Sequence, residues 1–212
     1  MIQAHPSVAI CESFGAIDIY LFDQLQKGRF DGRSRVLDAG CGDGRNLVHL
    51  LRCGFTCFAI DREVVAVDHV RSLASALAPT LPRENFRVGE LDALPWADRT
   101  MDTLICSAVL HFSRDKAHFA RVVTELWRVL APDGLFFARL ASTIGIEDRV
   151  THSGNGYALL PDGSERFVVD EATLMQWTAR LGGELLDPLK TTVVQEQRAM
   201  TTWVMRKGGA AR

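Results

Sequence analysis

The stretch VLDAGCGDGRN, residues 36–46, places three glycines on alternate positions directly after an apolar run. Glycine tolerates positive φ and lets a backbone approach a ligand closely, so such a turn can hold a nucleotide or simply connect a strand to a helix. A phosphate-binding P-loop needs a lysine after its last glycine, and none follows here. The dinucleotide fingerprint GxGxxG also fails, because Arg45 stands at its third glycine position. The turn is GxGxG, which does not specify a pyrophosphate.

Three aspartates accompany this turn. Asp38 directly precedes the glycines, Asp61 ends the next apolar run, and Asp92 follows the third. Asp38 would repel a phosphate and favour a cation, whereas Asp61 can accept hydrogen bonds from ribose hydroxyls. Because open α/β sheets bind ligands at the carboxyl ends of their strands, the three acids predict a nucleoside that carries a positively charged group.

Plainer interpretations of the same residues remain open. The glycines could form only a tight turn, Asp38 could cap the first helix, and Asp92 could be a loop acid without a ligand. His111 follows the fourth predicted strand and could face a substrate or be a partly buried structural histidine. Trp96 is expected to pack its loop, and Arg198 could hold an anionic substrate or form a surface ion pair.

Apolar periodicity predicts a chain of alternating strands and helices around these motifs. Such alternation indicates β-α-β crossovers, hence a parallel sheet with helices on both faces. The segment at 142–169 is glycine-rich and polar and is too long for an ordinary connection, so we expect a substrate loop or lid there. We predict one domain over 1–212, with an N-terminal helix at 12–27, a cofactor-binding core at 35–141, and a closing helix and strands at 170–206.

Composition limits the class of protein. The 212 residues are 47% hydrophobic and 24% charged, as in a soluble globular domain. The net charge of −2 offers no global attraction to nucleic acid or to an anionic membrane, and no apolar stretch approaches the roughly 20 residues that span a bilayer. We find no signal peptide. The five cysteines (Cys11, Cys41, Cys53, Cys57, Cys106) are expected to be buried thiols without a zinc site, which favours the cytoplasm.

Four stretches together carry a resemblance to a known family. VLDAGCGDG, AIDRE, GELDALPWADRTMDTLICSAVLHF and ELWRVLAPDGLFFARL occur in this order and resemble class I S-adenosylmethionine-dependent methyltransferases. The resemblance covers residues 36–140. It implies an α/β, doubly wound, mostly parallel seven-stranded sheet of the Rossmann-like methyltransferase type, with a C-terminal antiparallel hairpin. Within this family, residues 40–61 look like the tellurite-resistance type of small-molecule methyltransferase.

The resemblance also implies roles for residues of the first half of the chain. The backbone at Gly40, Cys41 and Gly42 would approach the methionine part of S-adenosylmethionine. Asp38 would orient that end of the cofactor, Asp61 would hold the ribose diol, and the neighbouring Arg62 would flank the adenine.

Further roles fall after the third and fourth strands. Asp92, with Leu91 and Ala93 beside it, would meet the exocyclic amine of the adenine. Ser107 would line the methyl-donating end of the cofactor. His111 is the candidate general base, which an alcohol or phenol acceptor would need and an already anionic acceptor would not.

These observations predict methyl transfer from S-adenosylmethionine to a small-molecule acceptor by in-line displacement, without a metal. No Asn/Asp-Pro-Pro-aromatic motif follows strand four and no basic segment is present, so no nucleic-acid substrate is expected. Two alternatives remain. One is a non-catalytic module that binds S-adenosylmethionine. The other is a nicotinamide-dependent oxidoreductase, which is disfavoured because neither Tyr20 nor Tyr157 has a lysine one helical turn away.

Overall fold

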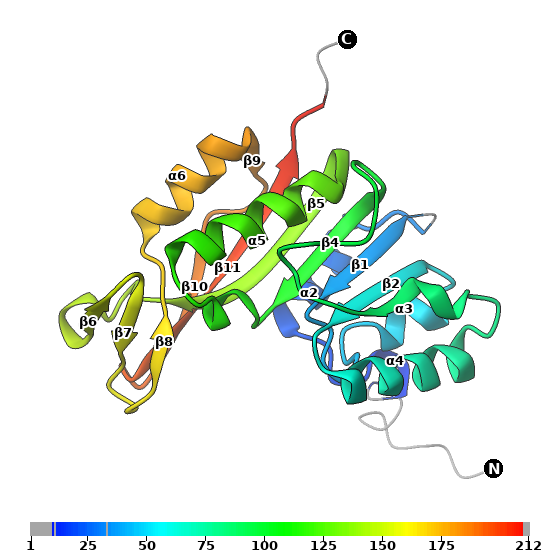
Figure 1. The fold of residues 1–212 in the computed structure, drawn as a ribbon, viewed down its shortest axis with the longest axis horizontal. Helices are drawn as coiled ribbons and strands as arrows, with labels where there is room; N and C mark the ends of the chain where they lie inside the picture. The colour runs from blue at the N-terminus through cyan, green and yellow to red at the C-terminus, as the bar shows by residue number, and fades with distance from the viewer. Residues whose placement is uncertain (1–9, 11, 33, 210–212) are drawn as a thin grey trace. The chain divides into compact units, whose positions relative to one another are not determined.

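The computed structural model describes residues 10, 12–32 and 34–209 of the chain. It divides into two compact units, residues 1–90 and residues 91–212, whose elements are labelled in Figure 1. The prediction of a single domain over 1–212 stays a prediction. Cys11 lies outside the described residues.

The first unit contains a parallel three-stranded arrangement. Strand β2 pairs in parallel with β1 on one side and with β3 on the other. Nearly all residues of β1 and β2 are buried, as expected for parallel strands covered on both faces. The bounds are β1 (Arg35–Ala39), β2 (Thr56–Asp61) and β3 (Phe86–Val88).

Helices α2, α3 and α4 and the 3₁₀ turn η1 lie in the described part of the first unit, with α4 packed against β2 and β3. The expected helix at 12–27 is interrupted, because Gly15 adopts a left-handed conformation and Asp18 caps a new helix by accepting from the Tyr20 amide at 2.9 Å. The bounds are α2 (Ile19–Gln26), α3 (Val48–Arg52), α4 (Val64–Leu77) and η1 (Arg83–Asn85).

The run RNLVHLLRCG at residues 45–54 predicts a helix that ends at Gly54, but α3 begins later than this. Residues 45–47 form turns, with the Leu47 amide donating to the Gly44 carbonyl at 2.9 Å, so only residues 48–52 are α-helical. The predicted end is correct, because Gly54 follows the C-cap Cys53 with φ of 80°.

In the second unit, four strands pair side by side in the order β10-β11-β5-β4, and the pairs are both parallel and antiparallel. Strands β4 and β5 are parallel, whereas β11 runs antiparallel to β5, β10 and the short β9. The predicted C-terminal hairpin is therefore confirmed as β10 and β11. The bounds are β4 (Met101–Ser107), β5 (Leu130–Ser142), β9 (Gly183–Leu185), β10 (Lys190–Val194) and β11 (Arg198–Lys207).

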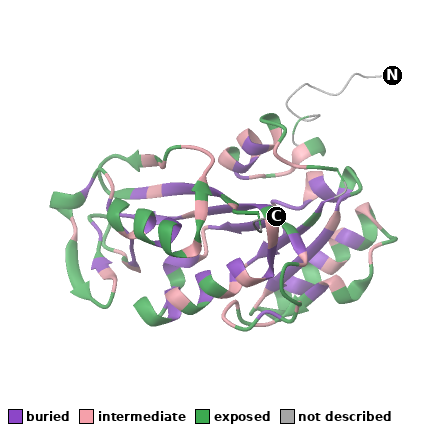
Figure 2. Cartoon of the chain, turned by 90° about the horizontal axis from the view of Figure 1, so that it is seen from above, coloured by how far each residue is buried: buried purple, intermediate pink, exposed green. Residues whose placement is uncertain are grey.

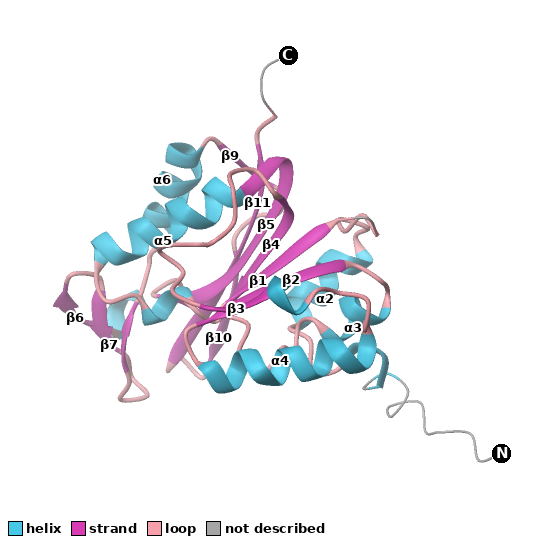
Figure 3. Ribbon diagram, turned by 45° about the vertical axis from the view of Figure 1, so that its right-hand side comes forward, coloured by secondary structure: helices cyan, strands magenta, loops and turns pink. Residues whose placement is uncertain are grey.

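Two helices belong to this unit, α5 (Lys116–Val129) and α6 (Glu171–Leu181) (Figure 3). Helix α5 contacts β5, and α6 contacts β9 and β11. Asp170 directly precedes the predicted helix and is the residue type that favours an N-cap; its carboxylate accepts from the Thr173 amide at 2.7 Å, which confirms this. The helical spacing of Trp127 predicts a core or near-surface position, and its side chain is buried.

The run DTLICSAVL predicts a strand over residues 102–110, but β4 ends earlier, at Ser107. Ala108 has φ of 63°, a left-handed conformation that ends the extended run. The chain then forms a 3₁₀ turn, η2 (Leu110–Phe112). His111 consequently lies on a turn just beyond the strand.

The segment at 142–169 is not the irregular loop that its composition suggested. It forms an antiparallel sheet of β6 (Thr151–Gly154), β7 (Tyr157–Leu159) and β8 (Glu165–Phe167), preceded by the 3₁₀ turn η3 (Glu147–Arg149). Strands of three or four residues are too short to show a clear alternation, which is why the sequence pattern missed them.

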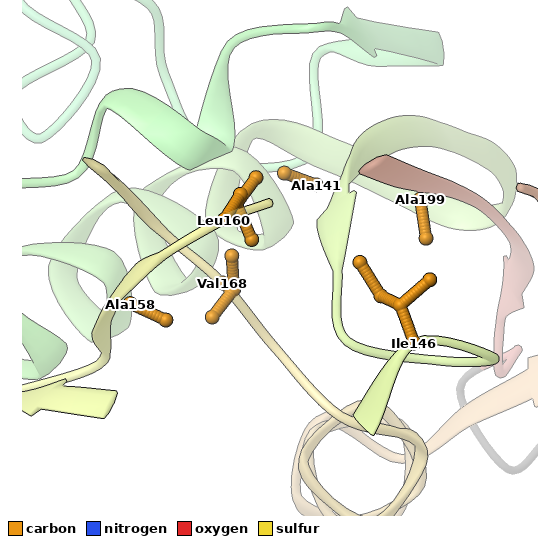
Figure 4. Close-up of a cluster of buried hydrophobic side chains, with 6 residues drawn as sticks. All are labelled: Ala141, Ile146, Ala158, Leu160, Val168 and Ala199. Atoms are coloured by element: carbon orange, nitrogen blue, oxygen red, sulfur yellow. The ribbon is translucent and has the colours of Figure 1, made fainter. Parts of the chain in front are cut away.

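A small apolar cluster joins this segment to the adjoining strands (Figure 4). Ala141 of β5 and Ala199 of β11 pack in it with four side chains from the segment, namely Ile146, Ala158, Leu160 and Val168. All six are buried. The segment is therefore anchored by its own core, while its role as a lid stays a prediction.

All seven predicted strands are present, and the fold is mixed α/β with parallel core strands and a C-terminal antiparallel pair. Buried residues line the central strands, whereas the helices also carry exposed residues (Figure 2). Cys41, Cys57 and Cys106 are buried thiols as expected, but Cys53 is exposed on the surface after α3. No helix among the described residues is long and apolar enough to cross a membrane.

Candidate functional site

The glycine turn follows β1 and is fixed to the end of β2. The amides of Gly40 and Cys41 both donate to the Ile60 carbonyl, at 2.8 and 3.1 Å. Gly40, Gly42 and Gly44 have φ of 78°, 50° and 75°. Residues other than glycine rarely adopt such φ angles, so this backbone path requires glycine at each alternate position.

The glycines at 42 and 44 have different surroundings. A Cβ atom on Gly44 would lie 2.9 Å from Cγ2 of Val70, a side chain of α4. A Cβ atom on Gly42 would meet nothing within 4 Å. Gly44 therefore allows close packing within the first unit, whereas Gly42 presents bare backbone to open space.

Asp61 ends β2 beside this turn, and two backbone amides fix its carboxylate. Oδ2 accepts from the Gly42 amide at 2.9 Å, and Oδ1 accepts from the Glu63 amide at 3.0 Å. Each carboxylate oxygen can accept a second hydrogen bond, so Asp61 is an oriented acceptor. The next residue, Arg62, is exposed and forms an ion pair with Glu63 at 3.3 Å.

Asp38 lies in β1 and is only 1% exposed. Burial raises the pKa of its carboxyl to about 7; Arg45 opposes this shift, and Asp61 and Asp43 add to it. Its Oδ2 has no hydrogen-bond partner among the described residues. Helix α3 begins after Leu47 without a side-chain cap, so Asp38 does not cap it.

The glycine turn has a negative electrostatic environment. Burial, followed by the charges of Asp38, Asp61 and Asp43, raises the pKa of the Cys41 thiol far above its ordinary range, so the thiol stays protonated. The same carboxylates disfavour an anion at the turn and favour a cation. A cation-bearing nucleoside such as S-adenosylmethionine fits these residues better than a pyrophosphate does.

The second unit places Asp92 differently from the expectation of a plain loop acid. Its Oδ2 lies 3.5 Å from Arg114 Nη2, 3.4 Å from Arg121 Nε and 3.7 Å from His118 Nε2. These partners were not expected from the sequence. His118 and Arg121 lie on α5 and Arg114 lies just before it, so the tertiary fold brings them to Asp92.

The loop that carries Leu91, Asp92 and Ala93 continues into a segment held by α5. Arg128 donates from Nη2 to the Leu94 carbonyl at 3.1 Å and from Nη1 to the Trp96 carbonyl at 3.0 Å. Glu125 accepts from the Leu94 amide at 2.8 Å and binds Arg128 at 2.7 Å. These contacts anchor the backbone directly after residues 91–93.

Ser107 and His111 follow each other at the carboxyl end of β4. Ser107 ends the strand and is buried. His111 is 6% exposed, and its Nδ1 has no hydrogen-bond partner in the part of the chain that the structure describes. Burial, reinforced by Arg166 and Arg139, lowers the pKa of His111 to about 4. The imidazole is therefore neutral near pH 7 and is a weak base.

A cleft of about 410 Å³ lies elsewhere in the second unit, beside the β6–β8 sheet and the start of α6. Its lining includes Lys116, His152 and Asp170. None of the site residues expected from the sequence lines it. The described residues thus bring together Asp38, the glycine turn and Asp61 in the first unit, and Ser107 with His111 in the second.

Comparison with known proteins points to one class. Residues 36–134 match the family model described as a methyltransferase domain. A probable S-adenosylmethionine-dependent methyltransferase of Mycolicibacterium smegmatis is 32% identical over 155 residues, which is 73% of this chain and 53% of that protein. The chain spans about half the length of the curated relatives it matches.

Solved structures agree on the fold. An S-adenosylmethionine-dependent methyltransferase of Methanosarcina mazei superposes with a TM-score of 0.69 at 19% identity, covering 88% of this chain and 98% of its own. The 1,6-didemethyltoxoflavin-N1-methyltransferase of Burkholderia thailandensis, bound to S-adenosylhomocysteine, gives 0.68 at 16% identity, covering 96% and 83%.

The chain therefore has the Rossmann-like methyltransferase fold that the family resemblance implied. The residues matched by the family model include the glycine turn, Asp61, Asp92 and His111. The narrower likeness to the tellurite-resistance type stays a prediction.

Proposed function

We propose that this protein transfers a methyl group from S-adenosylmethionine to a small-molecule acceptor by in-line displacement. The methyltransferase-domain match and the named relatives support the reaction class. The observation that carries the proposal is the glycine turn with Asp61 bound to its Gly42 amide and Asp43 within it, because these carboxylates favour a cationic nucleoside over a phosphate.

In this proposal the first unit binds one end of the cofactor. The backbone at Gly40, Cys41 and Gly42 approaches the methionine part, and buried Asp38 orients that cationic end. Asp61 accepts from the ribose hydroxyls with a carboxylate already oriented by two amides. Arg62 flanks the adenine.

Four residues of the second unit keep the roles that the family resemblance implies. Leu91, Asp92 and Ala93 are proposed for the adenine, and Ser107 for the methyl-donating end. The assignment rests on position, because Leu91, Asp92 and Ala93 follow β3 and Ser107 ends β4. The ion pairs of Asp92 leave its Oδ1 as the oxygen proposed for the adenine amine.

Bound S-adenosylmethionine supplies a methyl group on a sulfonium, whose leaving group is a neutral thioether. The protein therefore has mainly to orient the acceptor and exclude water. If the acceptor carries a proton on its nucleophile, His111 is the group proposed to accept that proton. The small acceptor, the independence from metal and nucleic acid, and the cytoplasmic location are parts of the same proposal.

Calorimetric titration tests the cofactor assignment. We expect S-adenosylmethionine and S-adenosylhomocysteine to bind and NADH not to bind. Replacing Asp61→Ala should weaken S-adenosylhomocysteine binding by about 1–3 kcal/mol, the scale of a hydrogen bond to a charged group. Asp68→Ala, an exposed aspartate of α4, is the matched control and should leave the affinity unchanged.

Two results would overturn the proposed methyl transfer. NADH binding without binding of either adenosyl compound would favour an oxidoreductase, and adenosyl binding without methyl transfer to small thiols, oxyanions or phenols would indicate a non-catalytic binding module. Unchanged affinity in the Asp61→Ala variant would remove only the ribose assignment.

A further inference from the structure

The cleft of about 410 Å³ beside the β6–β8 sheet is lined entirely by residues of the second unit. Its volume falls within the range of small-molecule sites, about 300–1,000 Å³. Thr143, which lines it, directly follows the carboxyl end of β5. Because open α/β sheets bind ligands outside the carboxyl ends of their strands, the cleft lies where the fold accommodates a ligand.

Buried backbone fixes one part of the cleft lining. Val168 and Val169 line the cleft and are buried. The Thr143 amide donates to the Val169 carbonyl at 2.9 Å, and the Val168 amide donates to the Gly156 carbonyl at 2.8 Å. Val168 also packs in the apolar cluster that anchors this segment (Figure 4). These contacts order the lining without a ligand, so binding requires little further ordering.

Two carboxylates line the cleft, and each accepts from a backbone amide. Glu147 Oε1 accepts from the Gly145 amide at 2.9 Å, and Asp170 Oδ1 accepts from the Thr173 amide at 2.7 Å. Hydrogen bonds from these donors lower the pKa of both carboxyl groups, so both are ionised near pH 7. Glu147 keeps its second oxygen, Oε2, as an acceptor for a ligand.

The cleft also contains a positive charge that neither carboxylate neutralises. Lys116, at the start of α5, lines it. In the part of the chain that the structure describes, neither Lys116 nor Glu147 forms an ion pair, with each other or with a third residue. Asp170 interacts with His152 instead. Opposite charges that share one cleft without pairing are complementary to a ligand that carries both charges.

An aromatic side chain completes the lining. The Tyr157 hydroxyl donates to the Ser113 carbonyl at 2.9 Å, which ties β7 to the residue after η2. The Tyr157 ring packs edge-to-face against Phe167, with 6.2 Å between the ring centroids. Both contacts fix the ring, which can contact the carbon skeleton of a small ligand.

We propose that this cleft binds a small organic zwitterion, with Lys116 binding its anionic group and Glu147 binding its cationic group. The ligand's carboxylate accepts from the lysine ammonium, and the ligand's ammonium donates to Glu147. A ligand with only one of these charges leaves either Lys116 or Glu147 unpaired and binds more weakly. The inference goes beyond the proposed function, because it concerns a second ligand and does not depend on the cofactor.

Nuclear magnetic resonance titration of the full chain tests the proposal. Free glycine, β-alanine, γ-aminobutyrate and ε-aminocaproate carry both charges at increasing separation. The carboxylate and the amine of the same length, such as butyrate and butylamine for γ-aminobutyrate, carry one charge each. We expect at least one amino acid to shift the ring signals of His152, which lines the cleft, with a Kd of about 1 mM. It should bind about tenfold more tightly than either singly charged match.

Variants identify the groups responsible. Lys116→Gln should lower the affinity for the amino acid to about that of the matching amine, and Glu147→Gln to about that of the matching carboxylate. Glutamine at position 147 keeps an acceptor for the Gly145 amide, so the local structure is retained. Arg206→Gln and Glu184→Gln are the controls, because these exposed residues pair in register on β11 and β9 and do not line the cleft.

The possible results separate clearly. The proposal is overturned if every amino acid binds no more tightly than its singly charged matches, or if none shifts the His152 signals up to about 100 mM. Unchanged amino-acid affinity in either the Lys116→Gln or the Glu147→Gln variant would also overturn it. Binding of the amines alone or of the carboxylates alone would assign the cleft to a simple cation or anion instead. Titration of S-adenosylhomocysteine reports separately on the proposed function.

Discussion

Asp38 should make the stability of the protein depend on pH in an unusual direction. Its carboxyl is buried in β1 at 1% exposure, and burial raises its pKa from 3.8 to about 7. In the unfolded chain the same group regains water and its ordinary pKa. The perturbation that isolates this effect is Asp38→Asn, which keeps the shape of the side chain and cannot ionise.

The direction of the pH dependence follows from the order of the pKa values of Asp38 in the folded and the unfolded chain. Between pH 3.8 and about 7 the folded protein holds a proton on Asp38 that the unfolded chain has released. The contribution of Asp38 to the free energy of unfolding is therefore fully present below pH 3.8 and is lost as pH rises to about 7. A shift of about three pKa units corresponds to about 4 kcal/mol.

His111 acts in the opposite direction over nearly the same window. Its pKa is lowered from 6.5 to about 4, so the unfolded chain binds a proton there before the folded protein does. Its contribution is present above pH 6.5 and is lost as pH falls to about 4, by about 3 kcal/mol for this shift. In the wild-type protein the two effects largely offset each other.

Urea unfolding at several pH values between about 4 and 7.5 measures the free energy of unfolding of wild type and variant. The difference between Asp38→Asn and wild type should move in favour of the variant by about 4 kcal/mol from the low to the high end. Asp43→Asn, an exposed neighbour in the same turn, is the control. A difference that stays constant over this range would refute the reasoning, because Asp38 would then titrate alike in both states.

Three further predictions concern the turn, a helix cap and the histidine. Gly44→Ala should destabilise the fold by about 1–3 kcal/mol more than Gly42→Ala in urea unfolding, because only a Cβ atom on residue 44 meets a side chain of α4. Gly42→Ala should instead reduce the affinity for S-adenosylhomocysteine measured by calorimetry. A larger loss of stability in Gly42→Ala and a larger loss of affinity in Gly44→Ala would contradict both roles. Asp170→Ala should cost about 1 kcal/mol by thermal unfolding, since it removes the acceptor of the Thr173 amide, and Asp170→Asn should recover most of this. The free energy of unfolding of His111→Gln, taken relative to wild type, should move in favour of the variant by about 3 kcal/mol as pH falls from 6.5 to about 4, and a difference that stays constant in urea unfolding would contradict the buried neutral imidazole.

Regular elements with a strong pattern were predictable from sequence. The apolar runs of β1 and β2 and the stripe of α5 identified their type because burial on a sheet or helix face imposes a period on the chain. Ends were less predictable. Asp18 restarts a helix and Ala108 stops a strand through local backbone conformations that periodicity does not encode.

The site shows the same division. The sequence identified the glycines and Asp61, because a turn with positive φ and an acid after the next strand are local patterns. It did not identify the ion pairs of Asp92 with Arg114 and Arg121, or the packing of β8 against η2. These contacts join residues far apart in the chain, and a single sequence carries no direct signal for them.

By itself the sequence determined the alternation of strands and helices, the reaction class that its motifs resemble, and the turn that would receive the cofactor. Tertiary structure decided what each group experiences. Burial sets the pKa of Asp38 and of His111, packing against α4 separates the role of Gly44 from that of Gly42, and β8 packs against the turn that carries the histidine. The physical reason is that periodicity and turn chemistry are local, whereas desolvation and charge proximity depend on which distant segments surround a group.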